Sequence, residues 1–334
     1  SEKILFDHEL WGFGLRAYDQ VIQGLFPWAN IEVDKKFYGE NMELRVLNYF
    51  VATAQELNMT KAAQKLLVSQ PALSRQIADL EDELGVKLFN RQPRHLTLTP
   101  SGQYLLEQAK EILALTAKTK SNLQSSAVIS GDLTIAAGES VGMQRLMNIV
   151  SNIIQDYPTV RIHILSGDYE FAEKKLNIGT VDFAAIIGNV NISNYASIQL
   201  PERDVWGVLM TMDDPLAEKK VITPADLVGR TVLNSQQADT MHYFDNWFGN
   251  YKDDVNFIGT VNLSFNGTLL VKNNAAVMLT LDKIANTSSK SGLTFRPIAP
   301  TLSEPITVIW KHETNLSPVA ELFLNRLQAS IADD

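Results

Sequence analysis

The feature that most restricts how this chain can fold is a very short break between two amphipathic helical patterns. Residues 61–67 form the first pattern, and Thr60 is predicted to cap its N-terminus. Ser69 is predicted to cap the second pattern, which carries a proline in its first turn and ends at Gly85. An apolar helical repeat starting at Leu44 precedes both. Three helices, the last two joined by so tight a turn, predict a helix-turn-helix unit.

The next segment predicts a β-hairpin followed by a long helix. Residues 86–98 alternate on both sides of a polar Asn-Arg-Gln-Pro-Arg stretch, which is typical of a wing. Thr99 and Pro100 then open a helix expected to reach about Ser126. Its apolar stripe is too long and narrow for the small winged unit to cover, so we expect a dimer built on this helix. The stripe comprises Leu105, Ala109, Ile112, Thr116 and Leu123.

Charge is distributed unevenly along the chain. The net charge of −9 over 334 residues, taken alone, argues against nucleic acid as a partner. Residues 42–130 nevertheless carry a net +2, whereas residues 1–41 carry −3 and residues 131–334 carry −8. Because phosphate contacts depend on local charge, the middle block remains a candidate for binding DNA.

Candidate DNA contacts lie on the third helix and on the wing. A recognition helix directs the side chains of its N-terminal half at base edges, where Arg pairs with guanine and Gln with adenine. Basic residues on a wing suit backbone phosphates or the adjacent minor groove. The alternative is a three-helix packing unit whose polar side chains merely face solvent, but the accompanying wing and long helix favour DNA binding. The candidates are Gln70, Ser74 and Arg75 on the helix, Arg91 and Arg94 on the wing, and Lys87 at its base.

From residue 131 onward, strand and helix patterns alternate. Short apolar strands are predicted near residues 133–138, 160–164 and 181–187, with helices between them. Similar units recur through residue 281. This order predicts an α/β domain of two parallel-rich lobes, with a ligand cleft at the carboxyl ends of the strands.

Polar residues after these strands are candidate ligand contacts. Ser140 lies where the first strand leads into a helix N-terminus, whose free N–H groups favour a polar or anionic small molecule. The neighbouring Glu139 would disfavour an anion unless it points away. A serine at the position of Ser140 more often simply caps the helix, and the other candidates are more often ordinary loop residues. The remaining candidates are Ser166, Ser235, Ser264 and Asn266.

An enzymatic function finds no positive support. The five histidines are isolated, and neither a nucleophile elbow nor a phosphate-binding loop is present, so we expect no catalytic residue, metal or cofactor. The absence of cysteine excludes disulfides and a thiol nucleophile and fits a reducing compartment. Residues 1–30 do not show the order of a signal peptide, and no apolar run is long enough to span a bilayer. We expect a cytoplasmic protein.

The sequence closely resembles the LysR-type transcriptional regulators in several residue types at fixed spacings. The most diagnostic runs are Ala62-Ala63-Gln64-Lys65-Leu66, Ser69 through Ile77, and Leu80-Glu81. Residues 42–45, 84–91 and 96–102 extend the match, and a weaker one continues over residues 103–334. The residues before Met42 lie outside it.

The resemblance implies a fold and a mechanism class. It implies an N-terminal winged helix-turn-helix, a dimerising linker helix, and a two-lobed α/β effector domain like a type 2 periplasmic binding protein. It further implies a homotetramer on an interrupted palindrome, with a small effector in the interlobe cleft altering DNA bending or subunit arrangement. Motif matching carries over Gln70, Pro71, Ser74 and Arg75 as recognition-helix residues, with Arg91 and Arg94 as wing contacts. Residues 271–277 lack the glycines common at that point in relatives.

These observations predict a division of the chain and a function. Residues 1–41 are an extension, either a leader or a docking helix; residues 42–99 are the winged domain; and residues 100–127 are the linker helix. Residues 131–204 with 300–334 form one effector lobe, and residues 205–299 form the other. The expected function is sequence-specific binding of double-stranded promoter DNA, modulated by a polar or anionic effector. The alternatives are a solute-binding module with an architectural DNA-binding domain, or a cryptic enzyme.

Overall fold

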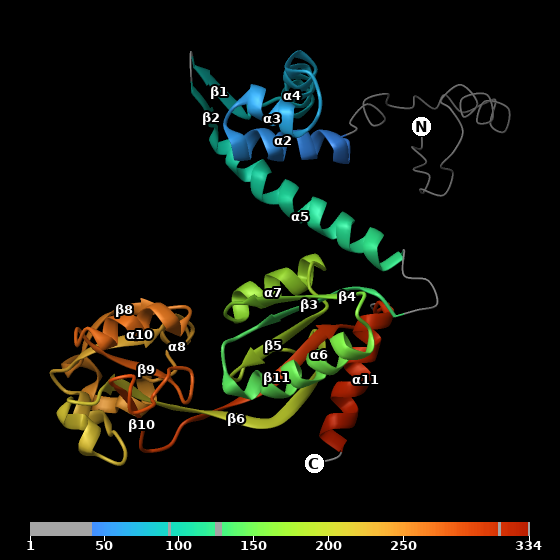
Figure 1. Ribbon diagram of the computed structural model, residues 1–334. Coiled ribbons are helices and arrows are strands. Elements are labelled where there is room, and N and C mark those ends of the chain that lie inside the picture. Colours follow the sequence, from blue (N-terminus) through green and yellow to red (C-terminus); the bar gives the residue numbers. More distant parts are fainter. Residues whose placement is uncertain (1–41, 93–94, 124–128, 313–314, 333–334) are drawn as a thin grey trace, which may run out of the picture. The chain divides into compact units, whose positions relative to one another are not determined.

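A computed structural model describes residues 42–92, 95–123, 129–312 and 315–332 of the chain (Figure 1). The chain divides into two compact units, Ser1–Ala109 and Lys110–Asp334. The expected extension 1–41 and the tip of the predicted wing, 93–94, lie outside the described residues.

The described part of the first unit contains three helices and a hairpin, followed by the start of a long helix. The first strand of the hairpin pairs antiparallel with the second, from Phe89 opposite Leu98 to Gln92 opposite His95. The predicted helix-turn-helix and wing are therefore confirmed. The elements are α2 (Leu44–Glu56), α3 (Met59–Lys65), α4 (Gln70–Leu84), β1 (Phe89–Gln92), β2 (His95–Leu98) and α5 (Pro100–Leu123).

Capping residues set the ends of these helices, with one change from the prediction. The Asn58 side chain accepts the Lys61 N–H at 3.0 Å, so Asn58 caps α3 and the predicted cap Thr60 is wrong. Thr60 lies inside the helix because α3 already begins at Met59. Ser69 caps α4 as predicted, accepting the Ala72 N–H, and Gly85 ends that helix with φ +67°.

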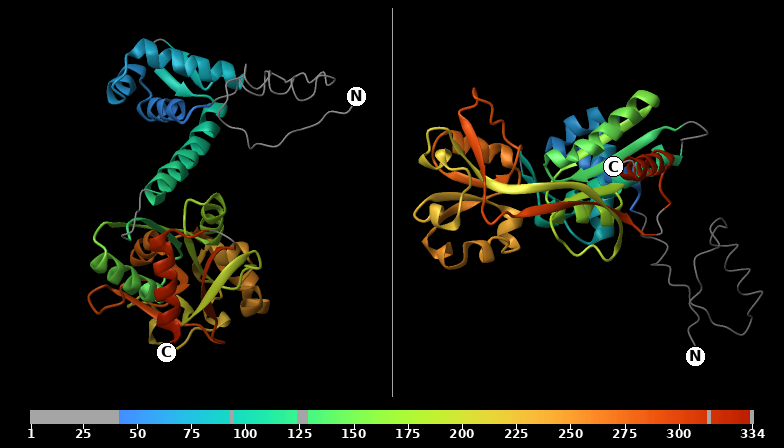
Figure 2. Two further views of the ribbon diagram at one scale, coloured as in Figure 1. Left: turned by 90° about the vertical axis from the view of Figure 1, so that its right-hand side faces the viewer. Right: turned by 90° about the horizontal axis from the view of Figure 1, so that it is seen from below.

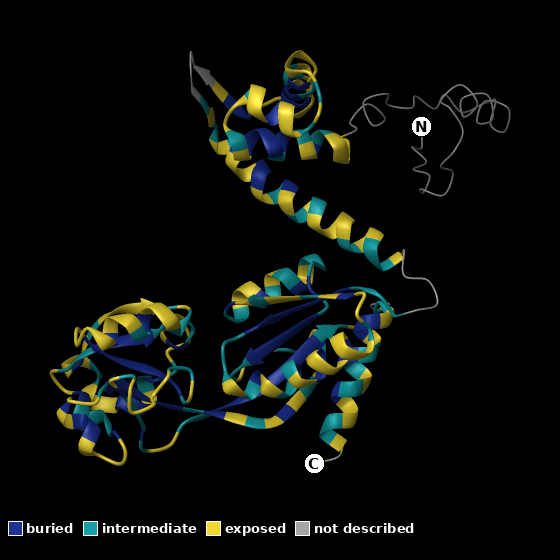
Figure 3. Cartoon of the chain, viewed as in Figure 1, coloured by how far each residue is buried: buried dark blue, intermediate teal, exposed yellow. Residues whose placement is uncertain are grey.

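A small apolar core holds α4 in place. Leu73, Ile77 and Leu80 are buried on one side of α4, so its opposite side faces solvent (Figure 3). The rings of Phe50 and Phe89, 5.5 Å apart, connect α2 to the hairpin within the same core. The helix-turn-helix is thus a packed unit with one free helical face.

Helix α5 begins where the prediction placed it. The Thr99 hydroxyl accepts the Gly102 N–H at 3.0 Å and donates to the Lys87 carbonyl at 2.6 Å. Leu105 and Ala109, two members of the predicted stripe, are buried within the chain's own first unit. The rest of the stripe is exposed: Ile112, Thr116 and Leu123.

The second unit includes the last turns of α5, which contact it through ion pairs. Lys118 Nζ lies 2.9 Å from Asp182 Oδ1, and both side chains are largely buried. Glu111 Oε1 lies 3.2 Å from Lys175 Nζ. Residues 124–128, which include the predicted helix end near Ser126, lie outside the described part.

The second unit is built on a nine-stranded sheet in the order β4-β3-β5-β11-β6-β9-β7-β8, with β10 pairing with β6. β3 is parallel to β4 and β5, and β7 is parallel to β8 and β9. The strands are β3 (Gly131–Ala137), β4 (Val160–Ser166), β5 (Phe183–Ile187), β6 (Tyr195–Thr211), β7 (Thr231–Ser235), β8 (Asn256–Val261), β9 (Val277–Leu281), β10 (Leu293–Pro297) and β11 (Ser303–Lys311).

The 17-residue strand β6 runs through both lobes of this sheet. Its first part pairs with β11, and its second part pairs with β9 and β10 (Figure 2). We call the part around β3, β4, β5 and β11 lobe 1, and the part around β7 to β10 lobe 2. Each lobe has its own apolar core, and Ile187 packs against both.

Helices cover the two lobes. Lobe 1 carries α6, α7 and α11, and lobe 2 carries α8, α9 and α10 (Figure 1). Within the described residues, no helix combines the length and hydropathy that a membrane crossing needs. The helices are α6 (Gln144–Asp156), α7 (Tyr169–Ile178), α8 (Gln236–Thr240), α9 (Asp245–Phe248), α10 (Ser264–Lys272) and α11 (Pro318–Ala332), with short 3-10 helices η2 (Val141–Met143), η3 (Pro215–Glu218), η4 (Pro224–Leu227) and η5 (Gly249–Asp254).

Candidate nucleic-acid interface and ligand cleft

The N-terminal half of α4 presents the predicted recognition residues to solvent. Gln70, Pro71 and Arg75 are exposed, and Ser74 is half-buried beside them. Leu73 and Ile77 between them point into the core. The helical period therefore puts the polar residues on the face that the protein's own packing leaves free.

Arg75 is available for an external partner. Among the described residues it makes no ion pair or hydrogen bond, whereas the exposed Arg45 pairs with Glu43 at 3.2 Å. An arginine on an exposed helix face, with five free donors, has the geometry for bidentate contact with a base edge or a phosphate.

Glu81 connects α4 to the wing. Its buried carboxylate accepts the backbone N–H groups of Leu88 and Phe89 at 2.9 and 3.1 Å, and the Lys87 ammonium at 3.1 Å. Burial opposes ionisation, but these hydrogen bonds outweigh it, so the pKa of Glu81 lies below its ordinary value. A charged Glu81 thereby fixes the base of the hairpin against the recognition helix.

The predicted wing contacts differ in what the structure describes. Lys87 is exposed, but its ammonium is shared with Glu81 and lies 3.6 Å from Asp82. The hydrogen bond to Glu81 raises the pKa of Lys87 and offsets part of the positive charge that a phosphate would meet. The Arg91 backbone belongs to β1, its side chain is not described, and Arg94 lies outside the described residues.

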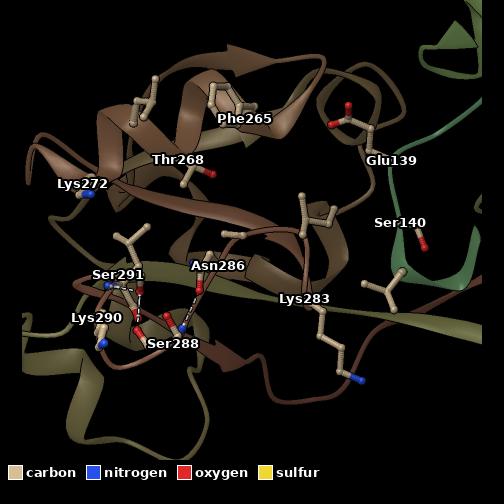
Figure 4. Close-up of a pocket in the computed structure, with 15 residues that line it drawn as sticks. Glu139, Ser140, Phe265, Thr268, Lys272, Lys283, Asn286, Ser288, Lys290 and Ser291 are labelled. Atoms are coloured by element: carbon tan, nitrogen blue, oxygen red, sulfur yellow. Dashed lines mark hydrogen bonds between the residues drawn. The ribbon is translucent and has the colours of Figure 1, made fainter. Parts of the chain in front are cut away.

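A cavity of about 750 Å³ lies between the two lobes (Figure 4). Lobe 1 contributes Glu139, Ser140 and Val141, from the turn between β3 and η2. Lobe 2 contributes one side of α10 and the loop between β9 and β10. The lobe 2 residues are Phe265, Thr268, Leu269, Lys272, Lys283, Ile284, Ala285, Asn286, Ser288, Lys290, Ser291 and Leu293.

Ser140 alone of the five predicted ligand contacts lines this cavity. Its hydroxyl caps η2 by accepting the Gly142 N–H at 2.8 Å, and it also hydrogen-bonds the Asp204 carboxylate. The capping role considered from the sequence is therefore present. The Ser140 hydroxyl that lines the cavity therefore already accepts a hydrogen bond within the protein.

The other four predicted contacts do not gather in the cavity. Ser235 caps α8, and Ser264 Oγ lies 3.3 Å from Thr280 Oγ1. Ser166 is exposed at the end of β4, the outermost strand of lobe 1, and Asn266 is exposed on α10. On α10 the cavity instead uses Phe265 and Thr268, because the helix turns Asn266 away from it.

The sequence prediction missed the cationic side of the cavity. Lys272, Lys283 and Lys290 line it together with the single carboxylate of Glu139. In Figure 4 the Lys283 side chain extends away from Phe265 and Thr268. Phe265, 70% exposed, adds an apolar surface. Phe265 directly follows the predicted contact Ser264 in the sequence. No local sequence pattern identifies Lys283 and Lys290 in the loop.

Two buried carboxylates lie behind Ser140. Asp204 on β6 and Glu304 on β11 are register partners across adjacent strands. Burial raises the pKa of Asp204, the Glu304 and Asp282 carboxylates add to the rise, and hydrogen bonds from Ser140 and Gly142 oppose it. Glu304 accepts the Trp206 indole N–H at 2.9 Å. Among the described residues, no group of three or more acidic, histidine or cysteine side chains is arranged to hold a metal ion.

Comparison with known families assigns both units of the chain. Residues 44–103 match the family described as "Bacterial regulatory helix-turn-helix protein, lysR family", and residues 126–332 match "LysR substrate binding domain". The Hca operon transcriptional activator HcaR of Escherichia coli is 30% identical over 297 residues, covering 87% of this chain and 99% of that protein. The transcriptional regulator CysL of Bacillus subtilis is 31% identical over 202 residues, covering 60% of this chain and 67% of that protein.

Solved structures share the fold. CbnR, described as a LysR family transcriptional regulator, superposes with a TM-score of 0.68 at 21% identity, covering 87% of this chain and 99% of that one. Full-length CbnR complexed with its target DNA gives a TM-score of 0.67 at 21% identity, covering 86% of this chain and 100% of that one.

Proposed function

The chain belongs to the LysR family of bacterial transcriptional regulators, and from this premise we propose that α4 reads base sequence in the major groove of promoter DNA. The protein is a DNA-binding regulator with an effector-binding domain. The observation that carries the proposal is the solvent-facing N-terminal half of α4, which presents Gln70, Ser74 and Arg75. Among the described residues, Arg75 makes no ion pair. Arg91, Arg94 and Lys87 are proposed to contact the DNA backbone from the wing.

We propose that the functional assembly is a tetramer made of dimers. The exposed apolar residues at the end of α5 support pairing with a second copy of that helix. CbnR, with the same fold, has been crystallised with its target DNA. Regulation rather than catalysis, exerted in the cytoplasm where the DNA lies, is the activity that we propose for this assembly.

We propose that the interlobe cavity binds the effector, a polar or anionic small molecule. The three lysines support a ligand with negative charge, and Phe265 supports one that also carries an apolar part. A thermal-shift screen of metabolites tests this proposal, because a ligand that binds only the folded protein raises its melting temperature. Lys272→Ala combined with Lys290→Ala should abolish the shift for an anionic ligand.

Replacing Arg75 tests the DNA-reading role. Arg75→Ala should weaken binding to a duplex selected from a random pool by about 10- to 100-fold, because a bidentate base contact is worth about 1–3 kcal/mol. Binding to unrelated duplexes should change little. Fluorescence anisotropy at fixed salt measures both.

Arg45→Ala is the matched control, since Arg45 is an exposed arginine on α2 that pairs with Glu43. If wild-type protein bound selected and unrelated duplexes equally, the architectural alternative would replace the proposal. If Arg75→Ala weakened binding to selected and unrelated duplexes equally, and by more than Arg45→Ala, Arg75 would be a phosphate contact only.

A further inference from the structure

One side chain of lobe 2 is hydrogen-bonded twice to lobe 1. The Gln237 carboxamide, on α8, accepts the backbone N–H of Tyr169 at 3.2 Å through its Oε1 atom. Its Nε2 atom donates to the backbone carbonyl of Ile187 at 3.0 Å. Tyr169 begins α7 and Ile187 ends β5, so both partners belong to lobe 1.

The two lobe 1 groups form a site that suits a carboxamide. Tyr169 is the first residue of α7, and a helix leaves its first N–H groups without an intrahelical acceptor. The Asp168 cap satisfies the Phe171 N–H at 3.0 Å and leaves that of Tyr169 to Gln237. A carboxamide supplies one acceptor and one donor from the same planar group, whereas a carboxylate lacks the donor that the Ile187 carbonyl requires.

The hydrogen bonds of Gln237 lie at the junction between the two lobes, where they can affect how close the lobes are. Ile187 packs against the cores of both lobes, and Gly188, with φ +101°, turns the chain immediately after it. The segment after α8 also reaches the connecting strand β6, because the Tyr243 ring lies 5.8 Å from the ring of Trp206 on β6. Neither Gln237 nor its two partners line the cavity. This contact therefore acts on the spacing of the lobes without occupying the effector site.

We propose that Gln237 is a latch that holds lobe 2 against lobe 1. The latch sets how far the cavity is already closed before a ligand arrives, and it goes beyond the DNA-binding and effector-binding roles proposed above. Two hydrogen bonds of ordinary strength shift an open–closed equilibrium by about 5- to 30-fold.

The distance between the lobes tests the latch in the full-length protein without ligand. Because the natural sequence has no cysteine, Ser151→Cys on α6 and Asn250→Cys in lobe 2 give two unique sites for spin labels, both exposed. Labelled chains are mixed with excess unlabelled chains so that pulsed electron paramagnetic resonance reports distances within one subunit. Gln237→Ala should increase the ratio of long to short distances about 5- to 30-fold.

Two further variants sharpen the result. Gln236→Ala, at the exposed neighbouring glutamine on the same helix, should leave the distance distribution unchanged. Gln237→Glu keeps an acceptor for the Tyr169 N–H but places a carboxylate oxygen against the Ile187 carbonyl, so it should open the lobes at least as much as Gln237→Ala. A wild-type distribution in Gln237→Ala, or in Gln237→Glu, would overturn the latch.

Amide hydrogen exchange gives an independent readout that also reveals any loss of folding. In Gln237→Ala the Tyr169 amide should exchange about 5- to 30-fold faster, while amides of the β3 and β11 ladder keep their protection. Unchanged exchange at Tyr169 would contradict the proposal. Faster exchange throughout both lobes would also contradict it, since it would show that Gln237 supports the whole fold rather than lobe spacing.

Discussion

Gly102 lies where the first turn of α5 passes the segment that leads into β1. A Cβ atom at this position would collide with the Leu88 carbonyl oxygen and press on the Leu98 side chain. The same turn is fixed by Thr99, whose hydroxyl bonds both the Gly102 N–H and the Lys87 carbonyl. A single missing side chain thus allows the long helix to pack directly on the wing.

Gly102→Ala should destabilise the winged unit by about 1–3 kcal/mol, because overpacking forces the backbone to shift. Amide exchange in α4 and β1 measures this change separately from the second unit. Gln103→Ala, at the exposed next position, is the control and should have little effect. Equal protection in the two variants would show that the turn has room for a methyl group.

At the scale of elements, α4 and the hairpin depend on each other through Glu81. Helix α4 supplies the carboxylate, and the chain entering β1 supplies two N–H groups that no strand partner takes at that point. The geometry of the recognition helix relative to the wing therefore depends on a buried charge. That charge has its own pH dependence, because the pKa of Glu81 is lower in the folded protein than the ordinary value of a glutamate carboxyl group.

The sign of this dependence follows from linkage. A carboxyl group whose pKa falls on folding contributes stability above its unfolded pKa, and the contribution disappears as pH falls through the folded pKa. Glu81→Gln should therefore cost about 1–3 kcal/mol at pH 7 and progressively less below about pH 4.5. Amide exchange of α4 between pH 3 and 7 tests this expectation. A constant difference between Glu81→Gln and wild type across that range would contradict it.

At the scale of the whole molecule, α5 belongs to both compact units. Its first turns are buried in the winged unit through Leu105 and Leu106, and its later turns contact lobe 1 through Lys118 and Glu111. Ile112 and Leu123 remain exposed, at 37% and 81%. The ion pairs of α5 with lobe 1 do not use its exposed apolar residues. The helix can therefore pack against α5 of a second copy while it keeps its contacts with lobe 1.

Ile112→Glu should weaken self-association by at least roughly tenfold, because each uncovered isoleucine loses about 1.5–3 kcal/mol of burial. Sedimentation over a range of protein concentrations measures the dissociation constant. Ala117→Glu introduces the same charge at an exposed position on another side of the helix and should change it little. Equal dissociation constants for the two variants would remove α5 from the dimer interface.

Local patterns were enough to predict the helix-turn-helix, the wing, the start of α5 and the alternating domain. Ser69, Gly85 and Thr99 act within a few residues of their own position, so their neighbours in the sequence already specify their roles. The wrong prediction of Thr60 as a helix cap also concerns only local sequence, because Asn58, two residues earlier, caps the same end of α3.

The cavity and its controls depend on contacts between distant segments. The sequence predicts Ser140 as a ligand contact because it follows a strand. Asp204 and the lysines of the loop after β9 are far from Ser140 in the chain, so no local pattern connects them with it. Gln237 meets Tyr169 and Ile187 only because the sheet order brings the two lobes together at β6 and β11. Periodicity records which face of an element is apolar, and it carries no information about which distant backbone group a polar side chain will meet.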